Sequence, residues 1–222
     1  MKLKRFGKVV YKNIPNIVSI LGILPLALLF VDNGYQYIIP LIIYNNIMDD
    51  LDGILATKLR LKSDFGAKLD NVCDAVAHTL FVMVIGMHYG LICGSISLIA
   101  IVSILIRVVS RLTFSNEAGS PTNELIRHLF FTLLLAELFG FDPVLLLIIV
   151  FLINTISMLW PYQMPYMIRS QAKTVFAVCM VNVFLILAWL VPYAILIIAG
   201  CFMLAYLYSF IKALGNIKTV NL

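Results

Sequence analysis

Four aspartates stand as two spaced pairs inside apolar stretches of the sequence. Asp49 and Asp52 are three positions apart, and Asp70 and Asp74 are four positions apart. Because both spacings return to one face of an α-helix, each pair presents its two carboxylates on the same side. A charge within an apolar span costs about 3 kcal/mol and therefore needs a partner or a wet cavity. Converging carboxylates also repel one another, so either some are protonated or divalent cations neutralise them.

The residue types narrow the choice of cation. Carboxylate oxygens without histidine or cysteine favour Mg²⁺ or Mn²⁺ over zinc. The four cysteines are scattered singly, so neither a disulfide framework nor a thiolate metal site is expected.

Small residues accompany the acids. Gly53 and Ala56 share a face of the segment that carries Asp52, and Gly66 lies one helical turn before Asp70. Such residues allow close approach, either of another helix as a packing seam or of a flat ligand. Beside the aspartates we favour a ligand floor, with the packing seam as the alternative.

The elements that hold these residues are predicted to be membrane helices. Hydrophobic residues make up 62% of the 222 positions and charged residues 12%, against about 25% charged in soluble domains. Lipid-exposed backbone must satisfy its own hydrogen bonds, which favours helices, and the alternating strands of a barrel are absent. We expect an all-α polytopic membrane protein, a single domain over residues 1–222 with about eight transmembrane helices. They fall near residues 14–31, 36–57, 66–90, 92–113, 125–139, 143–160, 174–190 and 193–211.

The distribution of basic residues predicts how the helices are oriented in the membrane. The 16 basic residues lie at the ends of apolar segments, on every second connection. By the positive-inside rule, both termini are cytoplasmic and the aspartates face the cytoplasm from the cytoplasmic membrane. Nucleic-acid binding is not expected, because that requires a basic patch in polar surroundings.

One predicted span has weaker support in the sequence than the others. Residues 125–139 are short for a span and could lie in the interface instead. We keep the segment as a span, because dropping it would place Arg169 and Lys173 outside. His88 and His128 are expected at the membrane interface.

The sequence from Asp49 to Asp74 resembles the signature of the CDP-alcohol phosphotransferases. That signature reads Asp-x2-Asp-Gly-x2-Ala-Arg-x8-Gly-x3-Asp-x3-Asp, and every spacing agrees here. A weaker likeness covers Ile14–Ser19. Thr57 stands where the signature has arginine, and Lys58 and Arg60 are the candidates to replace that charge.

The resemblance implies an activity and a fold. Members of this family transfer a phosphatidyl group from CDP-diacylglycerol to a small polar alcohol and release CMP. They have a six-helix core, to which this chain would add helices, and they form homodimers. Two Mg²⁺ or Mn²⁺ ions would be held by Asp49, Asp52, Asp70 and Asp74, and Asp74 is also the expected catalytic base. The residues expected to contact the CDP-lipid are Gly53, Ala56, Thr57 and Gly66.

Three residues are candidates for binding the acceptor alcohol. Arg107 and Arg111 are four positions apart and either snorkel to the interface or form an anion site. His78 continues the face of Asp70 and Asp74 by one turn; a hydrogen-bonded packing role is favoured for it, and orienting a carboxylate or contacting the acceptor is the alternative. Two cations suit an anionic or zwitterionic acceptor: serine first, as in the phosphatidylserine synthase-like branch, with glycerol 3-phosphate or inositol phosphate as alternatives.

A cation transporter is the alternative function of another class. Intramembrane aspartates also build cation pathways in transporters, which often show inverted repeats and charges near the bilayer midplane. The aspartates cluster near one face and no repeat is evident, so a cation transporter is the less favoured hypothesis.

Overall fold

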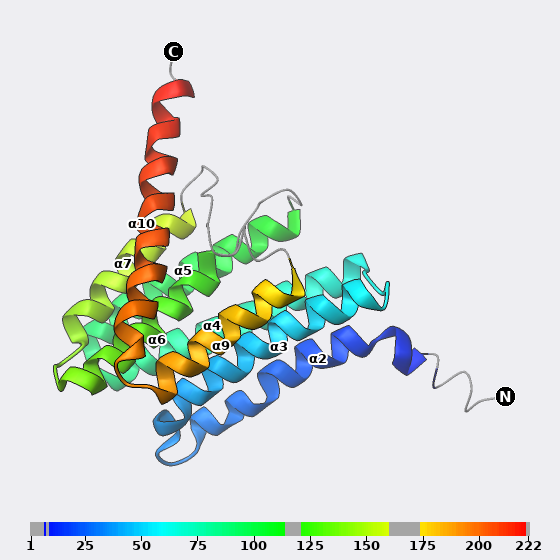
Figure 1. Ribbon diagram of the computed structural model, residues 1–222, viewed down its shortest axis with the longest axis horizontal. Helices are drawn as coiled ribbons and strands as arrows, with labels where there is room; N and C mark the ends of the chain where they lie inside the picture. The colour runs from blue at the N-terminus through cyan, green and yellow to red at the C-terminus, as the bar shows by residue number, and fades with distance from the viewer. Residues whose placement is uncertain (1–6, 8, 114–120, 160–173, 221–222) are drawn as a thin grey trace. The chain divides into compact units, whose positions relative to one another are not determined.

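The computed structural model describes residues 7, 9–113, 121–159 and 174–220, so the predictions for Arg169 and Lys173 fall outside the described residues. The chain divides into two compact units, Met1–Leu80 and Phe81–Leu222, with the boundary inside one helix. Figure 1 shows helices throughout, and the described residues contain no strand. This confirms the predicted all-α class.

One helix of the first unit changes its pitch along its length. α2 (Ile14–Ile23) continues as the 3₁₀ helix η1 (Leu24–Phe30). The change has a local cause, because Pro25 has no N–H to donate to the carbonyl of Leu21. The Tyr44 hydroxyl donates to that carbonyl instead, at 3.1 Å. This bond also ties α2 to α3 (Ile38–Lys58), against which it packs.

A tight connection carries the chain from α3 to α4 (Asp64–His88). Arg60 has a positive φ of 55°, and the N–H of Leu61 donates to the carbonyl of Ala56 at 2.9 Å. This is the Schellman arrangement that ends many helices. Ser63 then caps α4, since its Oγ accepts the N–H of Gly66 at 3.0 Å. The aspartates of α3 and α4 are therefore joined by a short, hydrogen-bonded turn.

In the part of the chain that the structure describes, the second unit continues from the end of α4 through five further helices. Near its start, a Cβ on Gly86 would overlap the Ser97 side chain, so the two helices that carry these residues approach closely. The five helices are α5 (Leu91–Thr113), α6 (Pro121–Phe139), α7 (Val144–Leu159), α9 (Val175–Leu190) and α10 (Ala194–Val220). α6 packs against both α7 and α10. In addition, α5 packs on α7, and α9 packs on α10.

The helices follow the predicted segments with three differences at their ends. The first segment is only partly α-helical. α6 begins at Pro121, inside the predicted loop, because proline is well suited to the first turn of a helix. α10 runs to Val220 instead of ending at residue 211. α6 is also buried at every position from Pro121 to Leu134, whereas a helix lying in the interface would expose one face.

Several helices are apolar enough for a bilayer. Among the described residues, three meet both the length and the composition of a span: Asp64–His88, Leu91–Ser110 and Ala194–Lys212. Shorter apolar stretches cover Ile14–Phe30, Val144–Leu159 and Val175–Leu190. α3 and α6 fall outside both groups, since each carries several charged side chains.

Candidate active site

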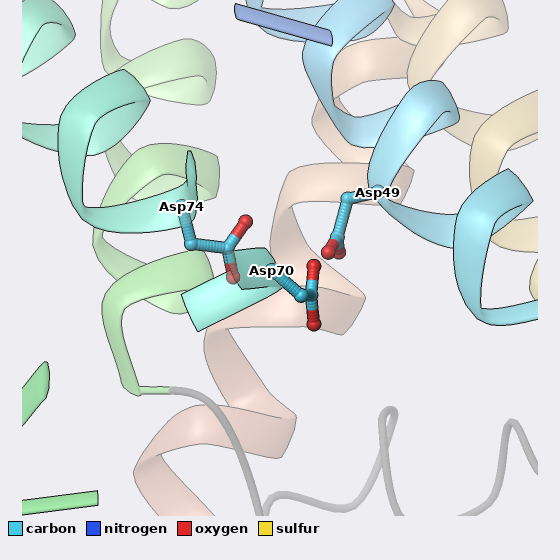
Figure 2. Close-up of side chains that lie close together, drawn as sticks. All are labelled: Asp49, Asp70 and Asp74. Carbon is cyan, nitrogen blue, oxygen red and sulfur yellow. The ribbon is translucent and has the colours of Figure 1, made fainter. Parts of the chain in front are cut away.

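Three of the four predicted aspartates converge in the first unit. Asp49 from α3 and Asp70 and Asp74 from α4 point toward one another (Figure 2). Each offers one carboxylate oxygen, and these oxygens all lie within 4.8 Å of one another. All three residues are half-buried.

The geometry suits a hard divalent cation. Ligand oxygens around an octahedral Mg²⁺ lie about 3–4 Å apart, because each Mg–O bond is about 2.1 Å. Small side-chain rotations would bring three oxygens within 4.8 Å to that spacing. The donors are oxygen only, as Mg²⁺ and Mn²⁺ prefer.

The fourth aspartate is held differently. Asp52 is buried, with 5% of its surface exposed, and its Oδ2 accepts a hydrogen bond from the Ser19 hydroxyl on α2. A buried carboxylate needs such a donor to offset its desolvation. Asp52 lies outside the group of three oxygens but lines the cleft beside it.

This cleft has a volume of about 350 Å³ and contains Asp70 in its wall. Asp70 therefore belongs both to the carboxylate cluster and to the cleft. All four residues predicted to contact the CDP-lipid also line it, together with residues of α2, α3, α4 and the turn between the last two. The full lining is Pro15, Asn16, Ser19, Asp52, Gly53, Ala56, Thr57, Leu61, Lys62, Ser63, Gly66, Ala67 and Asp70.

The two glycines of the cleft have different surroundings. A Cβ on Gly53 would meet no atom within 4 Å, so this glycine leaves open space rather than contacting another helix. A Cβ on Gly66 would lie 3.0 Å from Asn16 Oδ1 and 3.1 Å from Ser63 Oγ, which is a tight approach. The ligand-floor interpretation therefore suits Gly53, whereas Gly66 packs closely against Asn16 and Ser63.

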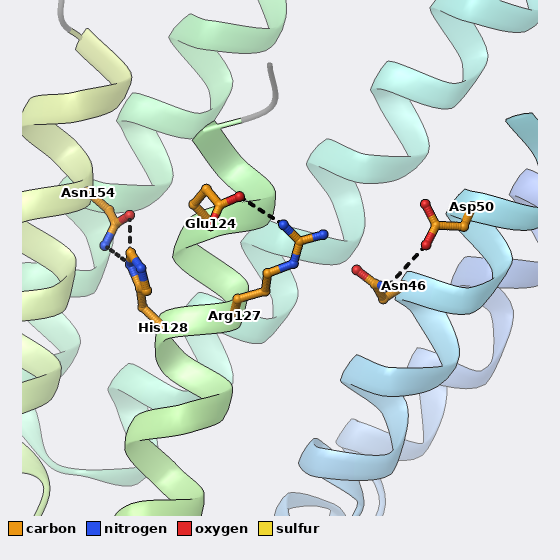
Figure 3. A network of polar contacts seen from close by, with 6 residues as sticks. All are labelled: Asn46, Asp50, Glu124, Arg127, His128 and Asn154. Carbon is orange, nitrogen blue, oxygen red and sulfur yellow. Dashed lines mark hydrogen bonds and ion pairs between the residues drawn. The ribbon is translucent and has the colours of Figure 1, made fainter. Parts of the chain in front are cut away.

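The neighbours of the signature positions can now be located. Asp50 lies outside the cluster and accepts a hydrogen bond from Asn46 at 3.4 Å (Figure 3). The Thr57 hydroxyl donates to the carbonyl of Gly53 at 2.9 Å. Neither Lys58 nor Arg60 is part of the cleft wall.

The predicted acceptor residues are divided between the units. His78 is buried on α4 in the same unit as the aspartates, with 4% of its surface exposed. Arg107 is half-buried on α5 in the second unit. Arg111 lies on the same helix, and its side chain is outside the described part of the structure.

The second unit contains a polar network that was not predicted from the sequence. On α6, Arg127 donates to Glu124 at 2.8 Å, and both side chains are buried (Figure 3). His128, which was predicted at the membrane interface, pairs with Asn154 of α7 at 3.0 Å and is 3% exposed. The signal was present, since positions 124, 127 and 128 have the spacing of one helix face.

A comparison with known families decides the relationship. The profile of the CDP-alcohol phosphatidyltransferase family matches residues 12–211. The chain belongs to this family. The matched region crosses both compact units and contains the carboxylate cluster and the cleft. With its apolar helices, the chain is an integral membrane protein.

One curated relative was also found. An uncharacterized protein of Aquifex aeolicus (strain VF5) is 33% identical over 88 residues. This alignment covers 38% of the present chain and 43% of that protein, so the chain spans less than half of its length.

Proposed function

We propose that the protein transfers a phosphatidyl group from CDP-diacylglycerol, or a related CDP-lipid, to a small polar alcohol with release of CMP. The observation that carries the proposal is the convergence of Asp49, Asp70 and Asp74 beside a cleft. Membership in the CDP-alcohol phosphatidyltransferase family supports it.

The carboxylates would hold the cofactor. Asp49, Asp70 and Asp74 would provide oxygen ligands to Mg²⁺ or Mn²⁺, and Asp52 would join them as the ligand for a second ion, held in place by Ser19. When bound, such cations neutralise the diphosphate and the CMP that leaves.

The cleft would hold the nucleotide end of the lipid. The open space at Gly53 admits a flat group against α3, and Ala56, Thr57 and Gly66 complete the wall around it. Close contact with the backbone would position the diphosphate next to Asp70, which lies in the same wall.

Asp74 would act as the general base. The alcohol oxygen attacks the phosphorus that carries the diacylglycerol, and its proton passes to the Asp74 carboxylate. The bond from that phosphorus to the CMP oxygen breaks, and CMP takes the electron pair. An alcohol is a weak nucleophile near neutral pH, so a positioned carboxylate accelerates its attack.

We further propose serine as the acceptor, ahead of glycerol 3-phosphate and inositol phosphate. Two arginines on α5, Arg107 and Arg111, suit an acceptor that carries a carboxylate or phosphate. His78 is proposed to contact the same acceptor. The distribution of basic residues supports a cytoplasmic site with both termini inside, and homodimerisation is proposed from family likeness alone.

A panel of alcohols tests the proposal. The purified protein is incubated with CDP-diacylglycerol, Mg²⁺ or Mn²⁺, and each alcohol in turn, and both CMP and the lipid product are measured by mass. We expect equal amounts of CMP and of one phosphatidyl product, with serine the best acceptor. The Asp50→Asn variant is the matched control for Asp74→Asn, which should abolish transfer. Release of no CMP with any alcohol would contradict the proposal, and it is the result that a cation transporter would give.

A further inference from the structure

The charges on the cleft wall are unevenly balanced for a diphosphate. Two of the lining side chains, Asp52 and Asp70, are acids, and the lining contains a single basic residue, Lys62. Carboxylates repel phosphate oxygens, so a nucleotide diphosphate in this cleft gains from every cation that faces it. Lys62 is therefore the side chain of the wall with the charge that the ligand needs.

The other candidate residues do not place a positive charge on the cleft wall. Thr57 replaces the arginine of the signature, and its hydroxyl proton is engaged by the carbonyl of Gly53 at 2.9 Å. Lys58 and Arg60 precede Lys62 on the same stretch of chain, yet neither contributes to the cleft wall.

The turn between α3 and α4 explains why Lys62 is on the wall. α3 ends at Lys58, and the positive φ of Arg60 reverses the chain direction before Lys62. Leu61, Lys62 and Ser63 then line the cleft together, just before the first residue of α4. The amino end of a helix carries partial positive charge and adds to the attraction for an anion.

Lys62 is also available for a ligand. Its side chain is exposed, and it makes no ion pair among the residues that the structure describes. An ammonium group has three donors on a flexible stem and binds phosphate as a point charge.

We propose that Lys62 binds the diphosphate of the CDP-lipid and supplies the positive charge that the arginine of the signature would otherwise bring to position 57. This inference rests on the proposed function and names the residue that selects a diphosphate over a less charged ligand. It concerns binding of the CDP-lipid rather than the transfer step.

Direct binding tests the proposal without turnover. Affinities are measured by titration of the full-length protein in detergent with Mg²⁺, using CDP-diacylglycerol, CDP, CMP and cytidine as probes. Lys62→Ala should weaken CDP-diacylglycerol and CDP about tenfold or more, as expected for a charge-assisted contact. Its effect should shrink for CMP and vanish for cytidine, which has no phosphate. Lys58→Ala and Lys68→Ala remove the same charge nearby, away from the wall, and should bind like the wild type.

Two variants ask whether the charge itself is responsible. Lys62→Arg should keep most of the affinity, and Thr57→Arg added to Lys62→Ala should restore much of what was lost. In turnover assays, Lys62→Ala should raise KM for the CDP-lipid more than it lowers kcat.

The outcomes separate this inference from the proposed function. Wild-type protein that binds no CDP-diacylglycerol would overturn both. Binding without any transfer would contradict the proposed function alone, and the binding series would still decide the role of Lys62. Equal affinities in Lys62→Ala and wild type, an equal loss in Lys58→Ala, or failure of both charge-restoring variants would overturn the role of Lys62.

Discussion

The two units of the chain treat charge inside apolar helices in opposite ways. In the first unit, carboxylates of like sign gather in a half-buried cluster beside a cleft. In the second, Glu124 and Arg127 have opposite signs and pair with each other in a buried setting at 2.8 Å. Like charges brought together repel one another unless some are protonated or a cation neutralises them, whereas opposite charges attract each other. The first arrangement is the one that we propose to bind cations, and the second is an ion pair within the protein.

The polar network of the second unit also includes aromatic rings and an amide side chain. Arg127 lies over the ring of Phe202, 5.8 Å from its centroid, and His128 contacts Tyr206 edge to face at 4.6 Å. Asn154 connects His128 to the carbonyl of Val150. These contacts join α6 to α7 and α10, so the polar face of α6 holds three helices together.

Removing one carboxylate of the cluster should have the largest effect. Asp70→Asn is expected to lower transfer about 10³-fold, because several kcal/mol of charge stabilisation is lost from the reacting group. Its thermal stability should not fall, since repulsion within the cluster is relieved. Initial rates of CMP release and thermal unfolding in detergent check the two parts. Asp50→Asn is the control, and an equal loss of activity there would show that any acid on these helices has the same effect.

Removing one partner of the buried Glu124–Arg127 pair should mainly lower the stability of the protein. Arg127→Met is expected to destabilise the protein by about 3–5 kcal/mol, because Glu124 is left buried without its partner. The double variant with Glu124→Gln should recover part of that loss, which a double-mutant cycle measures. Two single effects that simply add would mean that the pair is not coupled.

Divalent cations should stabilise only one of the two regions. At about 100 times its dissociation constant, Mg²⁺ or Mn²⁺ should add about 2.7 kcal/mol to the stability of the wild type. Asp70→Asn should lose this gain and Arg127→Met should keep it. Unfolding curves with and without chelator measure the shift, and a gain that survives in Asp70→Asn would place the ion elsewhere.

The two glycines of the cleft offer the finest test. Gly53→Ala should raise helix stability by up to about 1 kcal/mol while weakening CDP-lipid binding, because the new methyl group occupies open space in the cleft. Gly66→Ala should destabilise by about 1 kcal/mol, because its methyl group meets Asn16 and Ser63. A loss of stability in Gly53→Ala with unchanged binding would favour the packing-seam interpretation instead.

Local spacing predicted the three carboxylates that converge, but it also grouped Asp52 with them and did not predict the supports of the site. The intervals within Asp49–Asp74 predicted which carboxylates share helix faces, and a short connection made the two helices neighbours. The bond from Ser19 to Asp52 depends on how α2 packs against α3, which no local spacing reports. The turn with its positive φ at Arg60 likewise precedes Lys62, which lines the cleft, whereas Lys58 and Arg60 were the candidates named from the sequence.

α6 shows why average hydropathy is a poor guide to a buried polar helix. Its short predicted length, together with the polar residues Arg127, His128 and Glu137, made residues 125–139 the weakest predicted span, yet α6 is the most completely buried helix among those described. A hydropathy average counts Glu124 and Arg127 as two separate costs and does not register that they pair. The tertiary structure determines which charged side chains pair, and this pairing accounts for the burial of α6.

Binding of Mn²⁺ tests the central claim most directly. Free and bound Mn²⁺ are distinguished by electron paramagnetic resonance during titration of the purified protein in the presence of CDP. We predict saturable binding to the wild type and to Asp50→Asn, and loss of that binding in Asp49→Asn and Asp70→Asn. Mn²⁺ binding that is the same in all four proteins would contradict the claim that these carboxylates form the metal site.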